Sequence, residues 1–306
     1  MIYDVRQVTT YAYTSTVPFS RHAARLLPVN RPGQRVIEAA LDIDPAPAER
    51  SDARDFFGNR LTVFALEQPH AELVVSLSAR IEVQAPEPLL ASLTPPWEAV
   101  RSEAMASADL SSGSPAHFLY PSRSVALDPA ITAWTAESFP RSRPILEAAT
   151  ALMTRIKSGL RYQPGATDAK TPPAVAFAAK RGVCQDFAHV MIAGLRGLGL
   201  PAAYVSGYLR TDPPPGRPRL QGADATHAWV SVWCGEASGW VGLDPTNGIA
   251  AGEDHIVLAI GRDYADVSPL DGVIIASGEH SLTVEVDVVP VPSKPLGRSR
   301  PATAAQ

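Results

Sequence analysis

The chain has 306 residues, of which 45% are hydrophobic and 19% charged, a composition typical of a globular protein with one or two domains. Its net charge of −4 indicates no basic surface for nucleic acid or for an anionic membrane, so we expect neither as a partner. Two cysteines are too few for a disulfide framework and fit a reducing compartment, where a cysteine belongs to the core or does chemistry.

The first 85 residues have the pattern of β-strands. Apolar and polar residues alternate in YDVRQVTTYAY, and further strand-like runs follow in QRVIEAALDIDPA, NRLTVFALE and AELVVSLSARIEVQA. We therefore predict a β-sandwich-like domain over residues 1–85. The start contains no apolar run typical of a signal peptide or membrane anchor, so we expect a cytoplasmic protein.

Residues 86–118 are rich in Pro, Ser and Ala and predict a connector with one short helix. Beyond it, SRPILEAATALMTRIKSGL and the segment from Gly182 to Gly199 carry apolar residues at helical spacing. The runs AAYVSGYL, THAWVSVW, GWVGLDPTNG and SLTVEVDVVPV predict strands, with TDPPPGRPRL as a loop. The fold class is therefore α+β, with helices packed on an antiparallel sheet in a core over 119–289 and a flexible tail over 290–306.

Cys184 follows Gly182 and stands in the first turn of a predicted helix. The free N–H groups and the dipole of a helix N-terminus favour a thiolate there. His227 opens one strand and Asp244 closes the next. If Trp233 faces Ser238 across their hairpin, His227 lies opposite Asp244 on the same face of the sheet.

A thiolate, an imidazole and a carboxylate in this arrangement form the cysteine version of the acyl-transfer triad. Cys184 attacks a carbonyl, His227 protonates the leaving amine, and Asp244 orients the imidazole. The N–H of Cys184 is a natural oxyanion donor, and Gln185 is a candidate for the second one. Asp186, in the first turn, is expected to cap the helix rather than to act in catalysis.

Several segments together resemble the bacterial transglutaminase-like proteins, a superfamily with a papain-like core. The segments GVCQDFAHVMIAGLRGLGLPAAYVSGYL, THAWVSVW and GWVGLDPTNG are similar to its three core blocks, and YDVRQVTTYAY and DFFGNRLTVF are similar to its N-terminal β region. The resemblance implies Cys184 as nucleophile, His227 as base and acid, and Asp244 as orienting carboxylate. It covers nearly the whole chain except the tail and part of the connector.

Two positions depart from that resemblance. Ala203 stands where an arginine is common, and Ser231 stands where an acidic residue is common. Both changes alter the expected wall of the cleft and thereby the substrate. Trp229 shares the face of His227 and is a candidate for that wall, as is Tyr208, although strand aromatics also serve as core.

The residues leave several functions open. Hydrolysis of a peptide or amide bond is favoured over transfer to an amine. Transfer requires that water be excluded from the site, and this demands a dry tunnel. A peptide or protein is the expected substrate, and no cofactor is implied. The second hypothesis is that the protein is a non-catalytic peptide-binding module. Cys184, His227 and Asp244 as zinc ligands are a third, disfavoured because the short ligand spacings typical of zinc sites do not occur.

Overall fold

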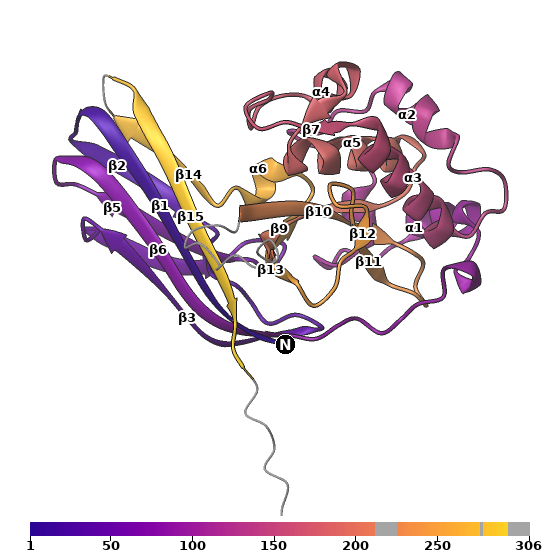
Figure 1. Ribbon diagram of the computed structural model, residues 1–306, viewed down its shortest axis with the longest axis horizontal. Coiled ribbons are helices and arrows are strands. Elements are labelled where there is room, and N and C mark those ends of the chain that lie inside the picture. Colours follow the sequence, from indigo (N-terminus) through magenta and orange to yellow (C-terminus); the bar gives the residue numbers. More distant parts are fainter. Residues whose placement is uncertain (212–224, 276–277, 293–306) are drawn as a thin grey trace, which may run out of the picture.

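The structure, a computed structural model, describes residues 1–211, 225–275 and 278–292 (Figure 1). Most of the segment TDPPPGRPRL and nearly all of the expected tail over 290–306 lie outside the described residues. Figure 1 shows two lobes, one built of strands and the other of helices around a smaller sheet. Within the described ranges, no helix combines the length and the hydropathy needed to cross a membrane.

The strand lobe consists of two four-stranded antiparallel sheets. The first has the strand order β15 (His280–Pro290), β1 (Ile2–Val17), β6 (His70–Val83) and β3 (Gln34–Asp44). The second has the order β14 (Leu270–Ile275), β2 (Phe19–Ala24), β5 (Arg60–Leu66) and β4 (Glu49–Arg54). Alternate residues of β6 are buried, as the two-residue period of a strand requires when one face meets a core.

The helical lobe surrounds a five-stranded antiparallel sheet. Its order is β12 (Ile249–Ala250), β11 (Trp240–Asp244), β10 (Ala225–Trp233), β9 (Ala202–Leu209) and β13 (His255–Gly261). A short parallel pair joins β7 (Arg161–Tyr162) and β8 (Arg181–Gly182). The helices are α1 (Trp97–Ala106), α2 (Pro129–Ala136), α3 (Ile145–Gly159), α4 (Pro173–Ala179), α5 (Cys184–Gly197) and α6 (Tyr264–Val267), with 3₁₀ turns η1 (Ala91–Leu93) and η2 (Pro115–Phe118).

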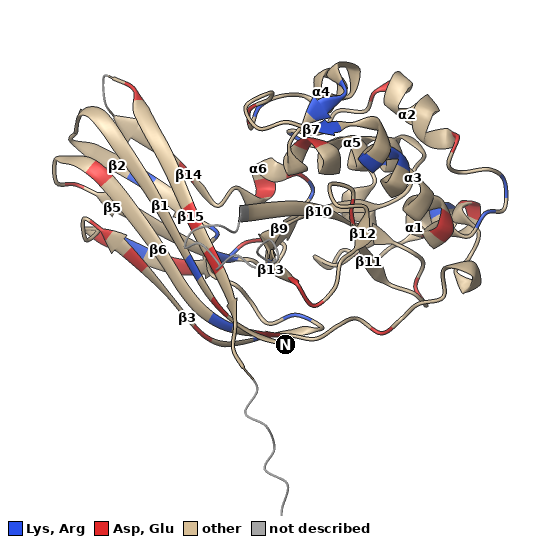
Figure 2. Cartoon of the chain, viewed as in Figure 1, with Lys and Arg blue, Asp and Glu red and all other residues tan. Residues whose placement is uncertain are grey.

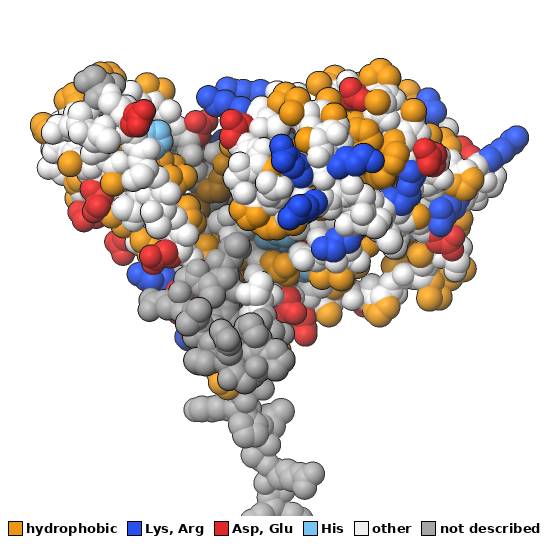
Figure 3. Space-filling model, turned by 45° about the horizontal axis from the view of Figure 1, so that its top comes forward, with side chains coloured by type: hydrophobic (Ala, Val, Ile, Leu, Met, Phe, Trp, Pro, Cys, Tyr) orange, Lys and Arg blue, Asp and Glu red, His pale blue; other side chains and the backbone are white. Residues whose placement is uncertain are grey.

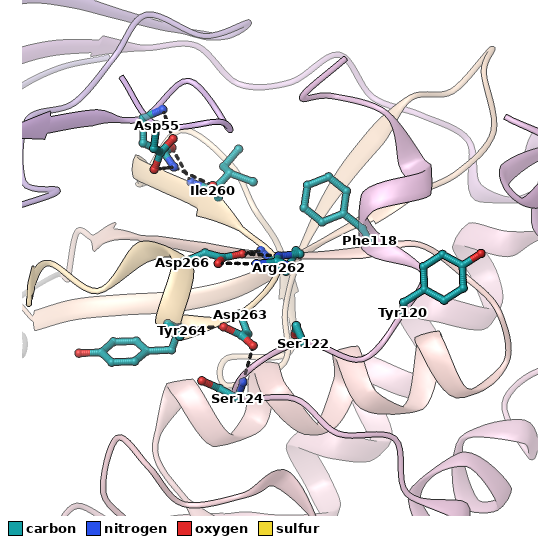
Figure 4. A network of polar contacts seen from close by, with 12 residues as sticks. Asp55, Phe118, Tyr120, Ser122, Ser124, Ile260, Arg262, Asp263, Tyr264 and Asp266 are labelled. Carbon is teal, nitrogen blue, oxygen red and sulfur yellow. Dashed lines mark hydrogen bonds and ion pairs between the residues drawn. The ribbon is translucent and has the colours of Figure 1, made fainter. Parts of the chain in front are cut away.

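Helix α5 is the central element of this lobe. All its residues from Gln185 to Arg196 are buried, and it packs against α2, α3, α4 and strands β9 and β10. At its C-terminal end, the buried guanidinium of Arg196 donates hydrogen bonds to four carbonyls and one hydroxyl, those of Phe118, Tyr120, Ala202, Arg262 and Ser122. Figure 4 shows this region, where the segment from Phe118 to Ser124 passes beside Arg262 and Asp266. Arg196 therefore fixes loops from three parts of the chain on one helix.

The lobes do not divide the chain where the sequence predicted. Strands β14 and β15 pair with β2 and β1 of the strand lobe, so the chain returns to its N-terminal sheets after the core. The predicted core boundary at residue 289 is therefore wrong, because a strand pattern does not tell which sheet a strand joins. In the predicted connector, Val100 and Ala104 of α1 belong to the hydrophobic core of the helical lobe.

The two lobes share buried surface. The hydrophobic cluster of the strand lobe includes Tyr208 of β9 and Ile256 and Leu258 of β13. Polar links run alongside: Asn59 donates to the carbonyl of Ile260 and accepts from its N–H, at 2.8 and 2.9 Å. These contacts hold the core sheet against the N-terminal sheets at β9 and β13.

Candidate active site

Asp244 ends β11 as a fully buried carboxylate. Its Oδ1 accepts from the N–H groups of Thr246 and Asn247, and its Oδ2 accepts from the Asn247 amide at 2.7 Å and lies 2.8 Å from His227 Nε2. Burial alone raises the pKa of a carboxyl, but the hydrogen bonds of His227, His255 and the Asn247 amide, together with the charge of His227, hold the pKa of Asp244 well below its usual value. Asp244 is therefore ionised and fixed in place.

His227 lies on β10 with its Nε2 toward Asp244, and its ring stacks on Trp229 at 6.1 Å between centroids. Burial alone lowers the pKa of this histidine. The hydrogen bonds and charges of Asp244 and Cys184 outweigh burial and raise the pKa of His227 to about 9. The ring is therefore held as an imidazolium at neutral pH. Since Nε2 faces Asp244, Nδ1 is the nitrogen left for Cys184.

Cys184 is the first residue of α5 and is only half-buried. The start of the helix is shaped by Asp186, whose Oδ2 accepts from the N–H of Val183 at 2.7 Å and from the hydroxyl of Thr167 at 2.6 Å. This confirms the predicted capping role of Asp186. Gly182 is required beside it, because a Cβ at residue 182 would lie 2.5 Å from Asp186 Oδ2.

The hairpin that carries His227 and Asp244 has a different register from the predicted one. Trp233 lies opposite Trp240 rather than Ser238, so the loop is two residues longer. Because side chains alternate with a period of two, a shift of two residues leaves Asp244 on the same face as His227. The two become diagonal neighbours rather than direct partners, and diagonal neighbours still lie within reach.

The other predicted site residues have different positions. The Gln185 amide donates to the carbonyl of Ala169 at 3.1 Å, so it supports the loop in front of the helix. Tyr208 is fully buried, and its hydroxyl donates to Gln7 of the strand lobe, so it belongs to the core between the lobes and not to the cleft wall. Trp229 flanks His227 as expected.

His255 is a partner of Asp244 that the sequence did not identify. Its Nδ1 accepts from the N–H of Gly252, so its Nε2 carries the hydrogen and points to Asp244 Oδ2 at 3.4 Å. The ring also meets Trp229 edge to face. No local signal marks His255, because it reaches Asp244 from β13, two strands away from β10 in the sheet.

Three ligand atoms of His227, Asp244 and His255 lie within 4.8 Å of one another, which makes this group a possible metal site in the described part of the chain. Each of these atoms is already used, since both Nε2 atoms face Asp244 Oδ2. A metal ion would have to replace these bonds. The donor set therefore fits a hydrogen-bonded histidine pair better than a resident ion.

Three cationic residues lie at or next to the β7–β8 pair, which ends two residues before Cys184. Arg161 and Arg181 face each other across the β7–β8 pair, and Lys180 precedes Arg181 at the end of α4 (Figure 2). All three side chains are exposed. Figure 3 shows Lys and Arg side chains on this lobe beside the hollow between the lobes, where a histidine is visible. Three exposed cationic side chains thus lie at or next to the strand pair that precedes Cys184, although the net charge of the chain is −4.

Known proteins are similar to this chain over most of its length. The profile of the bacterial transglutaminase-like N-terminal region matches residues 3–82, and that of the transglutaminase-like superfamily matches residues 132–245. An uncharacterized protein of Mycobacterium tuberculosis is 42% identical over 295 residues, covering 94% of this chain and 92% of its own. One of Mycobacterium leprae is 34% identical over 284 residues, covering 92% and 95%.

Two further comparisons concern proteins with an indicated activity. A protein-glutamine gamma-glutamyltransferase of Pseudomonas aeruginosa is 36% identical over 108 residues, which are 33% of this chain and 16% of that protein. The crystal structure of "a Putative Cysteine Protease" from Cytophaga hutchinsonii has a TM-score of 0.71 at 20% identity and covers 96% of this chain and 93% of its own, a likeness of fold. The chain belongs to the transglutaminase-like superfamily and carries the bacterial N-terminal region of that superfamily before its core.

Proposed function

We propose that this protein is a cysteine-dependent acyl-transfer enzyme that cleaves amide bonds of peptides or proteins through a thioester on Cys184. The observation that carries the proposal is the His227–Asp244 hydrogen bond of 2.8 Å, with the pKa of His227 raised to about 9 by Asp244 and Cys184. The thiolate form of a cysteine is the nucleophile in acyl transfer, and a neighbouring histidine is the group that exchanges protons with it and with the leaving amine. Cys184, His227 and Asp244 then act as nucleophile, acid–base and orienting group.

In the first half of the reaction, Cys184 Sγ attacks the amide carbon and forms a tetrahedral oxyanion. The N–H of Asp186 already donates to the carbonyl of Val183. The N–H groups of Cys184 and Gln185, the first two residues of α5, have no acceptor inside the helix and are suited to bind that oxyanion. The C–N bond then breaks, and the amine takes the proton of the His227 imidazolium. The acyl group remains on sulfur as a thioester.

In the second half, neutral His227 takes a proton from the incoming nucleophile, which attacks the thioester and displaces the thiolate. With water as nucleophile the product is a carboxylic acid. Hydrolysis is our preferred outcome, because Cys184 is only half-buried and transfer to an amine requires water to be kept away. Asp244 keeps its charge throughout and holds the ring.

Transfer to an amine is the second candidate. It is favoured by the similarity of a third of this chain to a protein-glutamine gamma-glutamyltransferase. In that reaction a primary amine replaces water, and the product is a new amide.

The test is incubation of the protein with a pool of glutamine-containing peptides, with and without a primary amine, read by mass spectrometry. Shortened or deamidated peptides are expected for hydrolysis, and amine adducts for transfer. Cys184→Ser should abolish all products, whereas Cys234→Ser, which changes a buried thiol outside the site, should retain them. Products that persist in Cys184→Ser would contradict the proposal. If the wild type forms no product from any peptide, a binding module would be favoured instead.

A further inference from the structure

A cavity of about 800 Å³ lies between the two lobes, behind Trp229 and His255. Its volume is in the range of small-molecule sites in proteins. Cys184, His227 and Asp244 are not among its lining residues. Its walls include four aromatic side chains, those of Phe57, Phe118, Trp229 and Trp240.

The floor of the cavity is a row of small residues in register. Ser231 of β10 pairs with Ala203 of β9 on one side and with Gly242 of β11 on the other, and all three line the cavity. Gly242 cannot be larger, because a Cβ there would lie 2.6 Å from the Cβ of Ala251. The space exists because three adjacent strands place no large side chain at this level.

Two of these small residues are the positions where the sequence departs from the superfamily pattern, with Ala203 in place of a common arginine and Ser231 in place of a common acid. The structure makes them direct cross-strand partners. An arginine and an acid at these positions would form an ion pair in this space. Here both charges are absent together, and the space is open.

Arg31, from the strand lobe, supplies the positive charge of the cavity. Its Nη2 donates to Asn59 Oδ1 at 2.7 Å, while its Nε is buried without a hydrogen-bond partner. It forms no ion pair with a described carboxylate, including Glu87, which also lines the cavity. The neighbouring Asp55 is engaged by Arg25 and Asn59 instead. Arg31 is partly buried, and Asp55 acts on its guanidinium through charge alone, with no ion pair or hydrogen bond between these two described residues. The buried Nε therefore keeps an unused donor, which a bound anion would satisfy.

Two other polar side chains at this junction, Gln34 and Asn59, use all their donors. Gln34 donates to the carbonyls of Val29 and Val257 and accepts from the N–H of Val257. Asn59 likewise donates twice and accepts twice. The unpartnered donor of Arg31 is therefore not shared by these two neighbours.

We propose that this cavity binds a small carboxylic acid with an aromatic or apolar body, its carboxylate on Arg31 and its body against Trp229 and Trp240. Guanidinium and carboxylate match in charge and geometry, and the aromatic walls match the apolar body. The bound acid contacts His255 and Trp229, which touch Asp244 and His227. The site is thus separate from the nucleophile but adjacent to the residues that orient its histidine.

The test is a titration of the whole protein with 4-phenylbutyrate, 4-phenylbutyramide and 4-phenylbutylamine, followed by tryptophan fluorescence, since two tryptophans line the cavity. The three probes share one body and differ in charge. The carboxylate should bind about tenfold or more tightly than the amide and the amine. Equal affinity of the three probes, or no saturable binding of the carboxylate up to about 10 mM, would overturn the proposal.

Three variants locate the site. Arg31→Gln should remove the preference for the carboxylate, and Ser231→Leu should abolish binding of all three probes by filling the floor. Arg35→Gln, in the same segment but in a surface ion pair with Glu82, is the matched control and should bind as the wild type does. Retention of the carboxylate preference in Arg31→Gln, or of binding in Ser231→Leu, would place the probe elsewhere and refute the site. The readout does not depend on enzymatic activity.

Discussion

His227 is the residue on which the proposed chemistry depends most directly. Its raised pKa of about 9 is the net result of burial, which lowers it, and of Asp244 and Cys184, which raise it. The imidazolium is present below the raised pKa and is lost above it. We therefore expect kcat/KM to fall as pH rises through about 9, measured as a pH–rate profile on a peptide substrate.

Asp244→Asn tests the cause of this shift. The amide removes the negative partner and leaves burial opposed only by Cys184, so the pKa of His227 should decrease and the alkaline fall should move to lower pH. The rate should also drop by about 10²–10⁴-fold, because the ring loses its orienting charge. An alkaline limb that stays near the wild-type position in Asp244→Asn would show that the carboxylate does not control His227.

The two cysteines provide a matched pair within one chain. Cys234 is fully buried, and burial raises its pKa to about 12, whereas Cys184 is half-buried beside an imidazolium. Iodoacetamide at pH 7 should label Cys184 faster than Cys234 by at least about 10²-fold, as followed by peptide mass spectrometry. His227→Ala should slow the labelling of Cys184 and leave Cys234 unchanged. Equal labelling of the two thiols would argue against an activated nucleophile.

At the level of elements, the position of Cys184 depends on how the turn between β8 and α5 is built. Gly182→Ala places a methyl group against Asp186, whose carboxylate holds the N–H of Val183. We expect a loss of about 1–3 kcal/mol of unfolding free energy and slower alkylation of Cys184, because the first turn must move. The measurements are urea unfolding and the labelling rate.

Gly113→Ala is the control for this change, because a Cβ at residue 113 meets no atom within 4 Å. Its unfolding free energy should stay within about 0.5 kcal/mol of the wild type. If Gly182→Ala changed neither the unfolding free energy nor the alkylation rate of Cys184, the close approach of Asp186 would not be what fixes the start of α5.

Local patterns predicted those parts of the site that are set within one element. The start of α5 and the capping by Asp186 follow from residue types near a helix terminus, and the structure confirms them. The hairpin register was wrong by two residues, but the side-chain period kept His227 and Asp244 on one face. His255 was not recognised as a partner of Asp244, because its contact depends on the order of strands in the sheet, which no single strand encodes.

For the whole molecule, the decisive feature is that the strand lobe is closed by the C-terminal strands of the same chain. β14 and β15 return from the core to pair with β2 and β1, so the helical lobe is inserted between parts of the strand lobe. The lobes are thereby linked twice through the backbone, in addition to the shared hydrophobic cluster. We infer that the lobes keep a fixed relation, on which the cavity between them depends.

Substitution of Asn59 tests directly whether hydrogen bonds hold the two lobes in a fixed relation. Asn59 is fully buried, and its amide bonds both the N–H and the carbonyl of Ile260 across the lobe junction, where Figure 4 shows Asp55 and Ile260 close together. Asn59→Ala leaves those two backbone groups and Arg31 without their partner. Since each unsatisfied buried group costs about 1–3 kcal/mol, the variant should lose about 2–4 kcal/mol of unfolding free energy in urea.

The matched control is Asn30→Ala, which removes an exposed amide of the same lobe that accepts from the N–H of Val36. Its loss should stay below about 1 kcal/mol, because water can replace an exposed partner. Asn59→Ala should also weaken binding of 4-phenylbutyrate, since Arg31 is held by Asn59. Were Asn59→Ala no less stable than Asn30→Ala, the junction would be held by its apolar cluster alone, and the cavity would not depend on these hydrogen bonds.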